Sequence, residues 1–201
     1  MLTHPDNSSK SFTVRDRLLE IQPSVKQWGI SDREGIVHRL DKQTSGLIVC
    51  ALNEDIFKLL QTFFKERTIY KEYVCIVEGK LRTQSGNIEV PLSRSRHNRI
   101  KREVRSEGRI SSSNFEVLLE GDTYSKLKIE LLTGRNHQIR SQMEFLGNPI
   151  VNDVLYGAKK VLELNENQIC LHSKKIRFEI KDENYEFEVN EPSFFNAFLN
   201  V

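Results

Sequence analysis

Cysteine is scarce in this 201-residue chain, and the three cysteines lie far apart, at Cys50, Cys75 and Cys170. An odd number of cysteines without metal-type spacing indicates reduced, buried thiols in a cytosolic compartment. Long apolar runs are also missing: the longest extends from Leu47 to Leu52, against the roughly 20 residues that a membrane helix needs. The polar, proline-containing start does not have the pattern of a secretory signal. We therefore expect a soluble, cytoplasmic protein with no membrane partner.

The chain also lacks the short motifs that mark several common enzyme classes. It has no Gly-rich nucleotide loop, no Walker phosphate-binding pattern and no zinc-type pair of histidines, which disfavours an ATPase, a dehydrogenase or a metallohydrolase. Hydrophobic residues make up 38% of the chain and charged residues 29%, a balance that excludes a disordered or low-complexity protein. The length predicts one domain, or at most one domain folded in two lobes.

Charge is nearly balanced overall but unevenly placed along the chain. The formal net charge is +2, yet the segment 93–110 carries seven basic and two acidic residues, and the segment 176–191 carries six acidic and two basic ones. A basic stretch of this kind suits the phosphates of a polyanion. A solvated surface loop is the alternative, and charge alone does not decide between the two.

Strand patterns outnumber helix patterns and do not alternate strictly with them. Six segments have the apolar runs or the period-two alternation of strands, namely 46–52, 69–79, 115–120, 127–131, 171–180 and 185–189. Turns are expected at Gly121–Asp122 and, within a C-terminal hairpin, around Asp182–Asn184. This pattern predicts an α+β fold with a mixed, mostly antiparallel sheet.

Three helices are expected beside these strands. The first has Asn53 as its N-cap and apolar residues at helical spacing over 56–64. The second carries its apolar face over 139–146 and stops at Gly147, and a short third helix begins at Pro192.

One polar segment, 36–47, is dense in functional groups just before a predicted buried strand. A single carboxylate, Asp41, lies among His38, Arg39 and Lys42. Loops at the ends of strands are where proteins mount reactive groups on a rigid support. The alternative is a surface turn whose aspartate hydrogen-bonds its own backbone.

A second polar segment, 132–142, follows a predicted strand and opens a predicted helix. Free backbone N–H groups at a helix start, with Arg135, His137 and Arg140 nearby, form a natural anion site. The two arginines are five residues apart and point to different faces of the helix, so one can meet phosphate while the other turns to a carboxylate. An ordinary capped helix with solvated charges is the alternative.

The first of these segments strongly resembles the catalytic signature of the RluA/RluD-type pseudouridine synthases, in the runs His38–Asp41 and Thr44–Leu47. Further motifs follow in the order of that family, at 70–74 with Gly79, at 91–94, at 133–140, at 147–157, at 171–172 and at 191–192. The resemblance covers almost the whole chain, and several long motifs in the correct order are far more specific than one short pattern.

The resemblance implies a pseudouridine synthase core, in which helices flank the sheet and a central cleft is wide enough for a polynucleotide. Residues 1–201 then form a single catalytic domain. The chain starts near the end of a turn at His4–Pro5, so we expect it to lack the usual N-terminal strand of the family, and also any S4-type domain. Two positions depart from the family pattern: Gln142 stands where a histidine is common, and Asn152 stands where a glycine is usual.

The resemblance also implies an activity, the isomerisation of a uridine within RNA to pseudouridine with neither a cofactor nor a metal. Asp41 is then the essential carboxylate, which attacks the sugar or assists its deprotonation. Arg140 is expected to face that carboxylate and to oppose its protonation. Tyr73 is expected to stack on the uracil. The alternatives are that Tyr73 is a packed strand aromatic and that Arg140 pairs with another acid.

An RNA partner, ribosomal or transfer, follows from the same resemblance. Arg39 is the candidate to fill the space that an extruded base leaves. Phosphate contacts, which fix register without reading sequence, are expected from a set of basic residues, Lys42, Arg94, Arg96, Arg99 and Arg135. The motifs do not encode which RNA is modified or the oligomeric state.

Two other functions are weighed against this one. The first is a catalytically inactive RNA-binding or assembly module with the same fold. The second is a glycosidase-like hydrolase that uses Asp41, which is disfavoured because such enzymes need a pair of carboxylates and the signature supplies one.

Overall fold

The computed structural model describes residues 3, 12–28, 31 and 33–199, so the predicted turn at His4–Pro5 lies outside the described residues. The chain divides into two compact units. The first combines Met1–Lys42 with Ile48–Ile69, and the second combines Gln43–Leu47 with Tyr70–Val201. The short segment Gln43–Leu47 therefore belongs to a different unit from the residues on either side of it.

The first unit contains the helix α1 (Val14–Ile21) and the short 3₁₀ helix η1 (Pro23–Gln27). Thr13 caps α1 through a capping box with Asp16, in which each side chain bonds the backbone N–H of the other residue. A core forms where α1 and η1 pack against the following loop, around Leu18, Val25 and Ile36. Burial of these aliphatic side chains holds two short helices that would not be stable alone.

The predicted helix after Asn53 is confirmed as α2 (Glu54–Glu66), also in the first unit. The Asn53 side chain accepts a hydrogen bond from the Ile56 N–H at 2.9 Å, as an N-cap does. Arg67, in the left-handed conformation at φ 64°, ends the helix. Phe57 faces inward and packs against Trp28, with ring centroids 5.2 Å apart.

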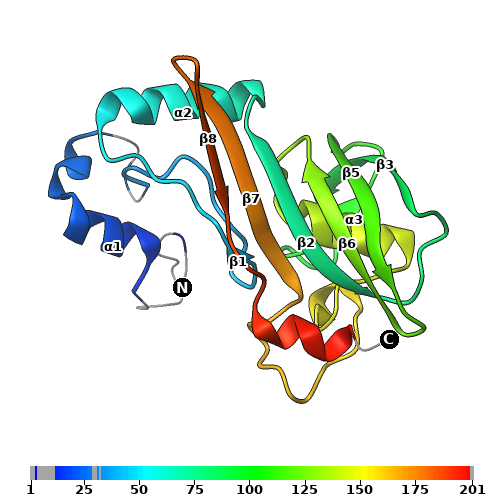
Figure 1. Ribbon diagram of the computed structural model, residues 1–201. Coiled ribbons are helices and arrows are strands. Elements are labelled where there is room, and N and C mark those ends of the chain that lie inside the picture. Colours follow the sequence, from blue (N-terminus) through cyan, green and yellow to red (C-terminus); the bar gives the residue numbers. More distant parts are fainter. Residues whose placement is uncertain (1–2, 4–11, 29–30, 32, 200–201) are drawn as a thin grey trace. The chain divides into compact units, whose positions relative to one another are not determined.

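The second unit contains one eight-stranded sheet, seen in Figure 1. Its strands are β1 (Ser45–Gly46), β2 (Tyr70–Glu78), β3 (Ser85–Arg94), β4 (Arg102–Val104), β5 (Arg109–Glu120), β6 (Tyr124–Leu131), β7 (Leu171–Ile180) and β8 (Glu183–Glu188). Their order is β1-β7-β2-β6-β5-β3-β4, and β8 pairs with the part of β7 beyond β1. Since β1 and β7 run parallel and the other described pairs run antiparallel, the predicted mixed, mostly antiparallel sheet is confirmed.

Two strand predictions need correction. The apolar run 46–52 is not one strand: only Ser45–Gly46 joins the sheet, and Cys50 forms an isolated bridge with Ile36. The physical reason is that the run is divided between the two units after Leu47, so it cannot continue as one strand of one sheet. The C-terminal hairpin turns at Lys181 and Asp182, both at positive φ, which is one residue earlier than predicted.

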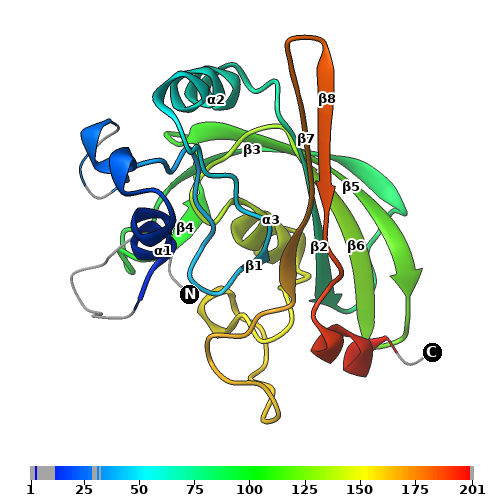
Figure 2. The same cartoon turned by 60° about the vertical axis from the view of Figure 1, so that its left-hand side comes forward.

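The helix predicted over 139–146 is confirmed as α3 (Gln138–Leu146), and Gly147 ends it at φ 83°. Figure 2 shows α3 on the inner side of the curved sheet, where it packs against β3, β4 and the short helix η2 (Val154–Tyr156). The final helix is a 3₁₀ helix, η3 (Ser193–Phe198), which begins after Pro192 as expected.

Gly46 is the residue on which the pairing of β1 with β7 depends. Its φ is +109°, and a Cβ atom placed on it would lie 2.2 Å from the Ser173 carbonyl oxygen and 2.6 Å from the Ser173 nitrogen. Neither atom can move without displacing β7. Only glycine combines this backbone conformation with so close an approach.

Gly46→Ala should therefore lower the free energy of unfolding by about 3 kcal/mol, because strain at positive φ adds to a clash with fixed backbone. Gly157→Ala is the matched control, since Gly157 has φ +90° but no neighbouring atom within 4 Å of the added Cβ. Its loss should be about 1–2 kcal/mol from backbone strain alone. Urea unfolding followed by circular dichroism measures both, and equal losses would contradict the importance of the contact with Ser173.

Candidate active site

Tyr73 lies in a row of residues that crosses three strands of the second unit. On β2 it pairs with Ser173 of β7, and Ser173 pairs in turn with Gly46 of β1. Paired residues of neighbouring strands project to the same face of a sheet, so Tyr73 and Gly46 share one face. The register shifts between Glu72 and Tyr73, and such β-bulges re-aim side chains near active sites. Tyr73 is 8% exposed, which fits both a stacking role and a packed aromatic, so its role stays a prediction.

The segment Gln43–Leu47 is held to β7 by side-chain and backbone contacts. The Ser45 hydroxyl lies 2.8 Å from Nδ1 of His172, and the Leu47 N–H donates to the Ser173 carbonyl at 3.0 Å. Burial lowers the pKa of His172, so its imidazole is neutral near pH 7 and pairs with the hydroxyl without a charge. These contacts give the Thr44–Leu47 part of the signature a structural role within the second unit.

Arg140, on α3, forms a buried ion pair with Asp153, the residue before η2. Its Nε donates to Oδ2 at 2.6 Å and its Nη2 to Oδ1 at 2.7 Å, the bidentate geometry of a strong arginine–carboxylate pair. The two side chains are 3% and 1% exposed. One alternative for Arg140 is that it pairs with another acid, and Asp153 is such a partner. The sequence assigned no role to Asp153. A contact between Arg140 and Asp41 stays a prediction.

Three further side chains surround the Arg140 guanidinium. Nη2 also donates to Oε1 of Gln43 at 3.0 Å, and Nη1 lies 3.4 Å from Nε2 of His137. The Arg140 guanidinium lies over the Tyr156 ring, with Cζ 4.8 Å from the ring centroid. A cation over an aromatic face is attracted by the ring quadrupole, so Tyr156 adds to the fixation of Arg140.

Tyr156 also connects α3 with the basic segment. Its hydroxyl accepts a hydrogen bond from the Arg102 N–H at 2.9 Å and lies 2.8 Å from Nδ1 of His137. Burial raises the pKa of Tyr156, so the hydroxyl keeps its proton at neutral pH. His137 is therefore a structural hydrogen-bonding residue in this arrangement, the role that the sequence favours for it over that of a general base.

Asp41 lies in the first unit and is half-buried, whereas Tyr73 and Arg140 lie in the second. Residues around Asp41 hold its loop from two sides. Nε2 of His38 accepts a hydrogen bond from the Val49 N–H at 2.8 Å, and the His38 ring stacks on Phe64 with centroids 4.6 Å apart. The Thr3 hydroxyl accepts from the Leu40 N–H at 3.4 Å. The loop conformation is thus specified by contacts that the polar motif alone does not reveal.

The predicted RNA-binding residues differ in how far their charge is already neutralised. Arg39, Lys42, Arg94, Arg96 and Arg99 are exposed. Nη2 of Arg96 lies 3.2 Å from Oε1 of Glu107, so this carboxylate competes with phosphate for the Arg96 guanidinium. Arg94 and Arg99 have no acidic partner among the described residues, which leaves them the stronger candidates.

Arg135 lies in the turn that leads into α3 and is half-buried. Its Nε donates to the Ile110 carbonyl at 3.1 Å. The Gln138 side chain accepts from the Arg135 N–H at 3.0 Å and from the Thr133 hydroxyl at 2.7 Å. Part of the donor set that the sequence offered for an anion is therefore occupied within the protein.

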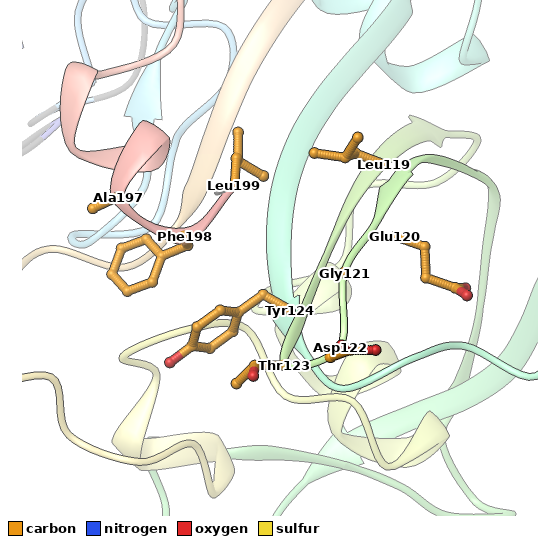
Figure 3. A pocket seen from close by; sticks show the side chains of 9 residues that line it. All are labelled: Leu119, Glu120, Gly121, Asp122, Thr123, Tyr124, Ala197, Phe198 and Leu199. Carbon is orange, nitrogen blue, oxygen red and sulfur yellow. The ribbon is translucent and has the colours of Figure 1, made fainter. Parts of the chain in front are cut away.

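None of the predicted site residues lines the cavity shown in Figure 3. It has a volume of about 330 Å³ and lies between the turn Leu119–Tyr124 and the end of η3 at Ala197–Leu199. The Tyr124 and Phe198 rings meet edge to face there, with centroids 5.3 Å apart.

No three histidine, cysteine, aspartate or glutamate side chains within the described part of the chain are grouped so that they could hold a metal ion. No helix in that part is both long and apolar enough to cross a membrane.

Asp153→Ala should destabilise the protein by about 3–5 kcal/mol, because it leaves the Arg140 charge buried without its carboxylate. Glu20→Ala is the control, since Glu20 pairs with Arg17 on the surface, with side chains 53% and 61% exposed, and should cost under about 1 kcal/mol. Urea unfolding compares the two variants. Equal small losses would show that the Arg140–Asp153 pair contributes little.

Comparison with known proteins identifies the family to which the chain belongs. A family model described as RNA pseudouridylate synthase matches residues 14–145, a range that includes Asp41, Tyr73 and Arg140. A solved structure of human RNA pseudouridylate synthase domain containing 1 superimposes with a TM-score of 0.72 at 27% sequence identity. That superposition covers 90% of this chain and 74% of the human one.

Two curated relatives from bacteria are similar over long ranges. Ribosomal large subunit pseudouridine synthase D of Borreliella burgdorferi is 35% identical over 204 residues, which is 100% of this chain and 62% of that relative. An uncharacterized RNA pseudouridine synthase of Mycobacterium bovis is 37% identical over 152 residues, 75% of this chain and 49% of the relative. The chain thus spans 62% and 49% of the length of these two relatives. It belongs to the RNA pseudouridylate synthase family.

Proposed function

We propose that this protein is an RNA pseudouridine synthase. The observation that carries the proposal is the family match over residues 14–145, which includes the whole signature around Asp41. The reaction is an isomerisation: the bond between the ribose C1′ and uracil N1 breaks, a bond between C1′ and C5 forms, a proton leaves C5, and N1 takes up a proton.

Asp41 is the carboxylate in this proposal, and it either attacks the sugar or assists its deprotonation. Both roles require the ionised form. Arg140 is proposed to stabilise the ionised Asp41 carboxylate. Its bidentate pair with Asp153 determines whether it does so by its charge or by its N–H groups. Because Asp153 already balances the positive charge, Arg140 acts mainly as a fixed set of N–H donors. Fixed donors cost no reorganisation during the reaction.

Tyr73 is proposed to lie against the uracil. Tyr73 shares a row and a face of the sheet with Ser173 and Gly46, with β7 between it and the anchored segment that follows Asp41 in the chain. An aromatic ring stacks on any base, because every base presents a π face, and this supports the extruded uracil without selecting it by hydrogen bonds.

The substrate is proposed to be ribosomal RNA first and transfer RNA second, both of which the cytoplasm supplies. The name of the Borreliella burgdorferi relative, which refers to the large ribosomal subunit, favours ribosomal RNA. Exposed basic residues are proposed to hold phosphates, and Arg39, next to Leu40 and Asp41, to fill the place of the flipped base.

The protein should release tritium from RNA that carries [5-³H]uridine, and Asp41→Asn should reduce this release at least 1000-fold, on the order of other losses of an essential catalytic group. Asp55→Asn is the control, because Asp55 is an exposed carboxylate in the first turn of α2. Large-subunit ribosomal RNA and transfer RNA transcripts are the substrates.

Two results would contradict the proposed activity. RNA binding without tritium release by the unmodified protein would indicate an inactive binding module. Release of free uracil would indicate a hydrolase.

Arg99→Ala should weaken RNA binding and lower the slope of log K against log salt by about 0.7–0.9, as the loss of one phosphate contact does. Arg96→Ala should change the slope less, because Glu107 already pairs with Arg96. Filter binding between about 50 and 200 mM salt measures both slopes. A larger effect of Arg96→Ala would reverse the assignment.

A further inference from the structure

Gln43 lies where the chain passes from the first unit to the second. It follows Asp41 by two residues, yet it is the first residue of the segment Gln43–Leu47 that belongs to the second unit. Its side chain is half-buried, and the family resemblance assigns it no role.

Both ends of the Gln43 amide are engaged within the second unit. Oε1 accepts from Nη2 of Arg140 at 3.0 Å, and Nε2 donates to the Glu166 carbonyl. The orientation of the amide follows from chemistry, because a flipped amide would place two donors together at Arg140 and two acceptors together at Glu166. The side chain is therefore specified by two partners of opposite kind.

The first partner of Gln43 is fixed. The Arg140 side chain is 3% exposed, and its guanidinium donates two hydrogen bonds to Asp153 on one side. Moving it would break a buried charge pair, which is costly. The Arg140 guanidinium is therefore a fixed hydrogen-bonding partner for the Gln43 side chain.

The second partner lies in a loop that Asn152 organises. Nδ2 of Asn152 donates to the carbonyls of Asn165 and Gln168, at 3.1 and 2.6 Å, and its Oδ1 accepts from the Val161 N–H at 3.0 Å. Asn152 is 3% exposed and has φ 65°, a conformation that glycine adopts most easily. The asparagine found here in place of the usual glycine thus closes the loop that presents the Glu166 carbonyl to Gln43.

We propose that Gln43 is a positioning residue for the reaction: it clamps the backbone two residues after Asp41 to Arg140 and to the Glu166 carbonyl. An extended chain covers at most about 3.6 Å per residue, so a fixed Gln43 holds the Asp41 backbone within about 7 Å of a known point. A misplacement of a catalytic group by about 1 Å can lower the rate roughly 100-fold, so restraint of the backbone next to Asp41 should affect the rate. The inference rests on the proposed function.

Gln43 is not needed to keep the segment in the sheet. Ser45 and Leu47 bond to His172 and Ser173 independently of it, and Gly46 makes its own close contact. Loss of the Gln43 amide should therefore affect the precision of the segment rather than the fold.

Gln43→Met, which keeps the length of the side chain and removes both hydrogen bonds, tests the proposal. The single-turnover rate of tritium release should fall about 10–100-fold. The RNA concentration for half-maximal rate should change less than about twofold, since the variant alters positioning and not uniform binding. Gln84→Met is the matched control, because Gln84 is exposed and bonds only to Glu120 through its side chain among the described residues. A rate within twofold of the unmodified protein would overturn the proposal, and so would a loss confined to RNA affinity.

Hydrogen exchange of the peptide that contains residues 40–44 gives a second measurement that does not depend on activity. Exchange should be faster in Gln43→Met and unchanged in Gln84→Met, and unchanged exchange in Gln43→Met would also overturn the clamp. If the unmodified protein releases no tritium at all, the proposed function fails, and the exchange comparison alone decides whether Gln43 holds this segment.

Discussion

The buried ion pair between Arg140 and Asp153 is the interaction on which the rest of the candidate site depends. Two charges that are almost fully removed from water are stable only when their geometry is good and their remaining hydrogen bonds are satisfied. Here the Asp153 carboxylate accepts two hydrogen bonds from the Arg140 guanidinium, and the Gln43 side chain accepts a further one. The pair connects α3 with the start of η2 and so fixes the group from which Gln43 and the Tyr156 ring take their positions.

A second constraint is the close approach of β1 to β7. The sheet accepts a two-residue strand only because Gly46 has no side chain and Ser45 finds a neutral, buried imidazole at His172. This strand carries the segment after Asp41 into the second unit, in the same row as Tyr73. The Thr44–Leu47 part of the signature is therefore explained by packing at the sheet edge as much as by chemistry.

Local patterns predict the elements that are locally determined, and fail where distant partners decide. The helix after Asn53 and the stop at Gly147 follow from capping and periodicity, and both are found. The strands β3 and β4 were not predicted, because β3 contains Gly86 and Pro91 and β4 has only three residues. Asp41, Tyr73 and Arg140 stand out through motif resemblance, whereas the roles of Asp153 and Gln43 rest on contacts across 13 and 97 residues that no local pattern encodes.

A double-mutant cycle on the single-turnover rate shows whether Asp153 and Gln43 act through the same guanidinium, that of Arg140. The variants are Asp153→Asn, Gln43→Met and the two combined, compared with the unmodified protein. We expect the double variant to be about as slow as Asp153→Asn alone, since Gln43 has no fixed partner once Arg140 is released. Losses that simply multiply would show that the two residues act independently, and would contradict this expectation.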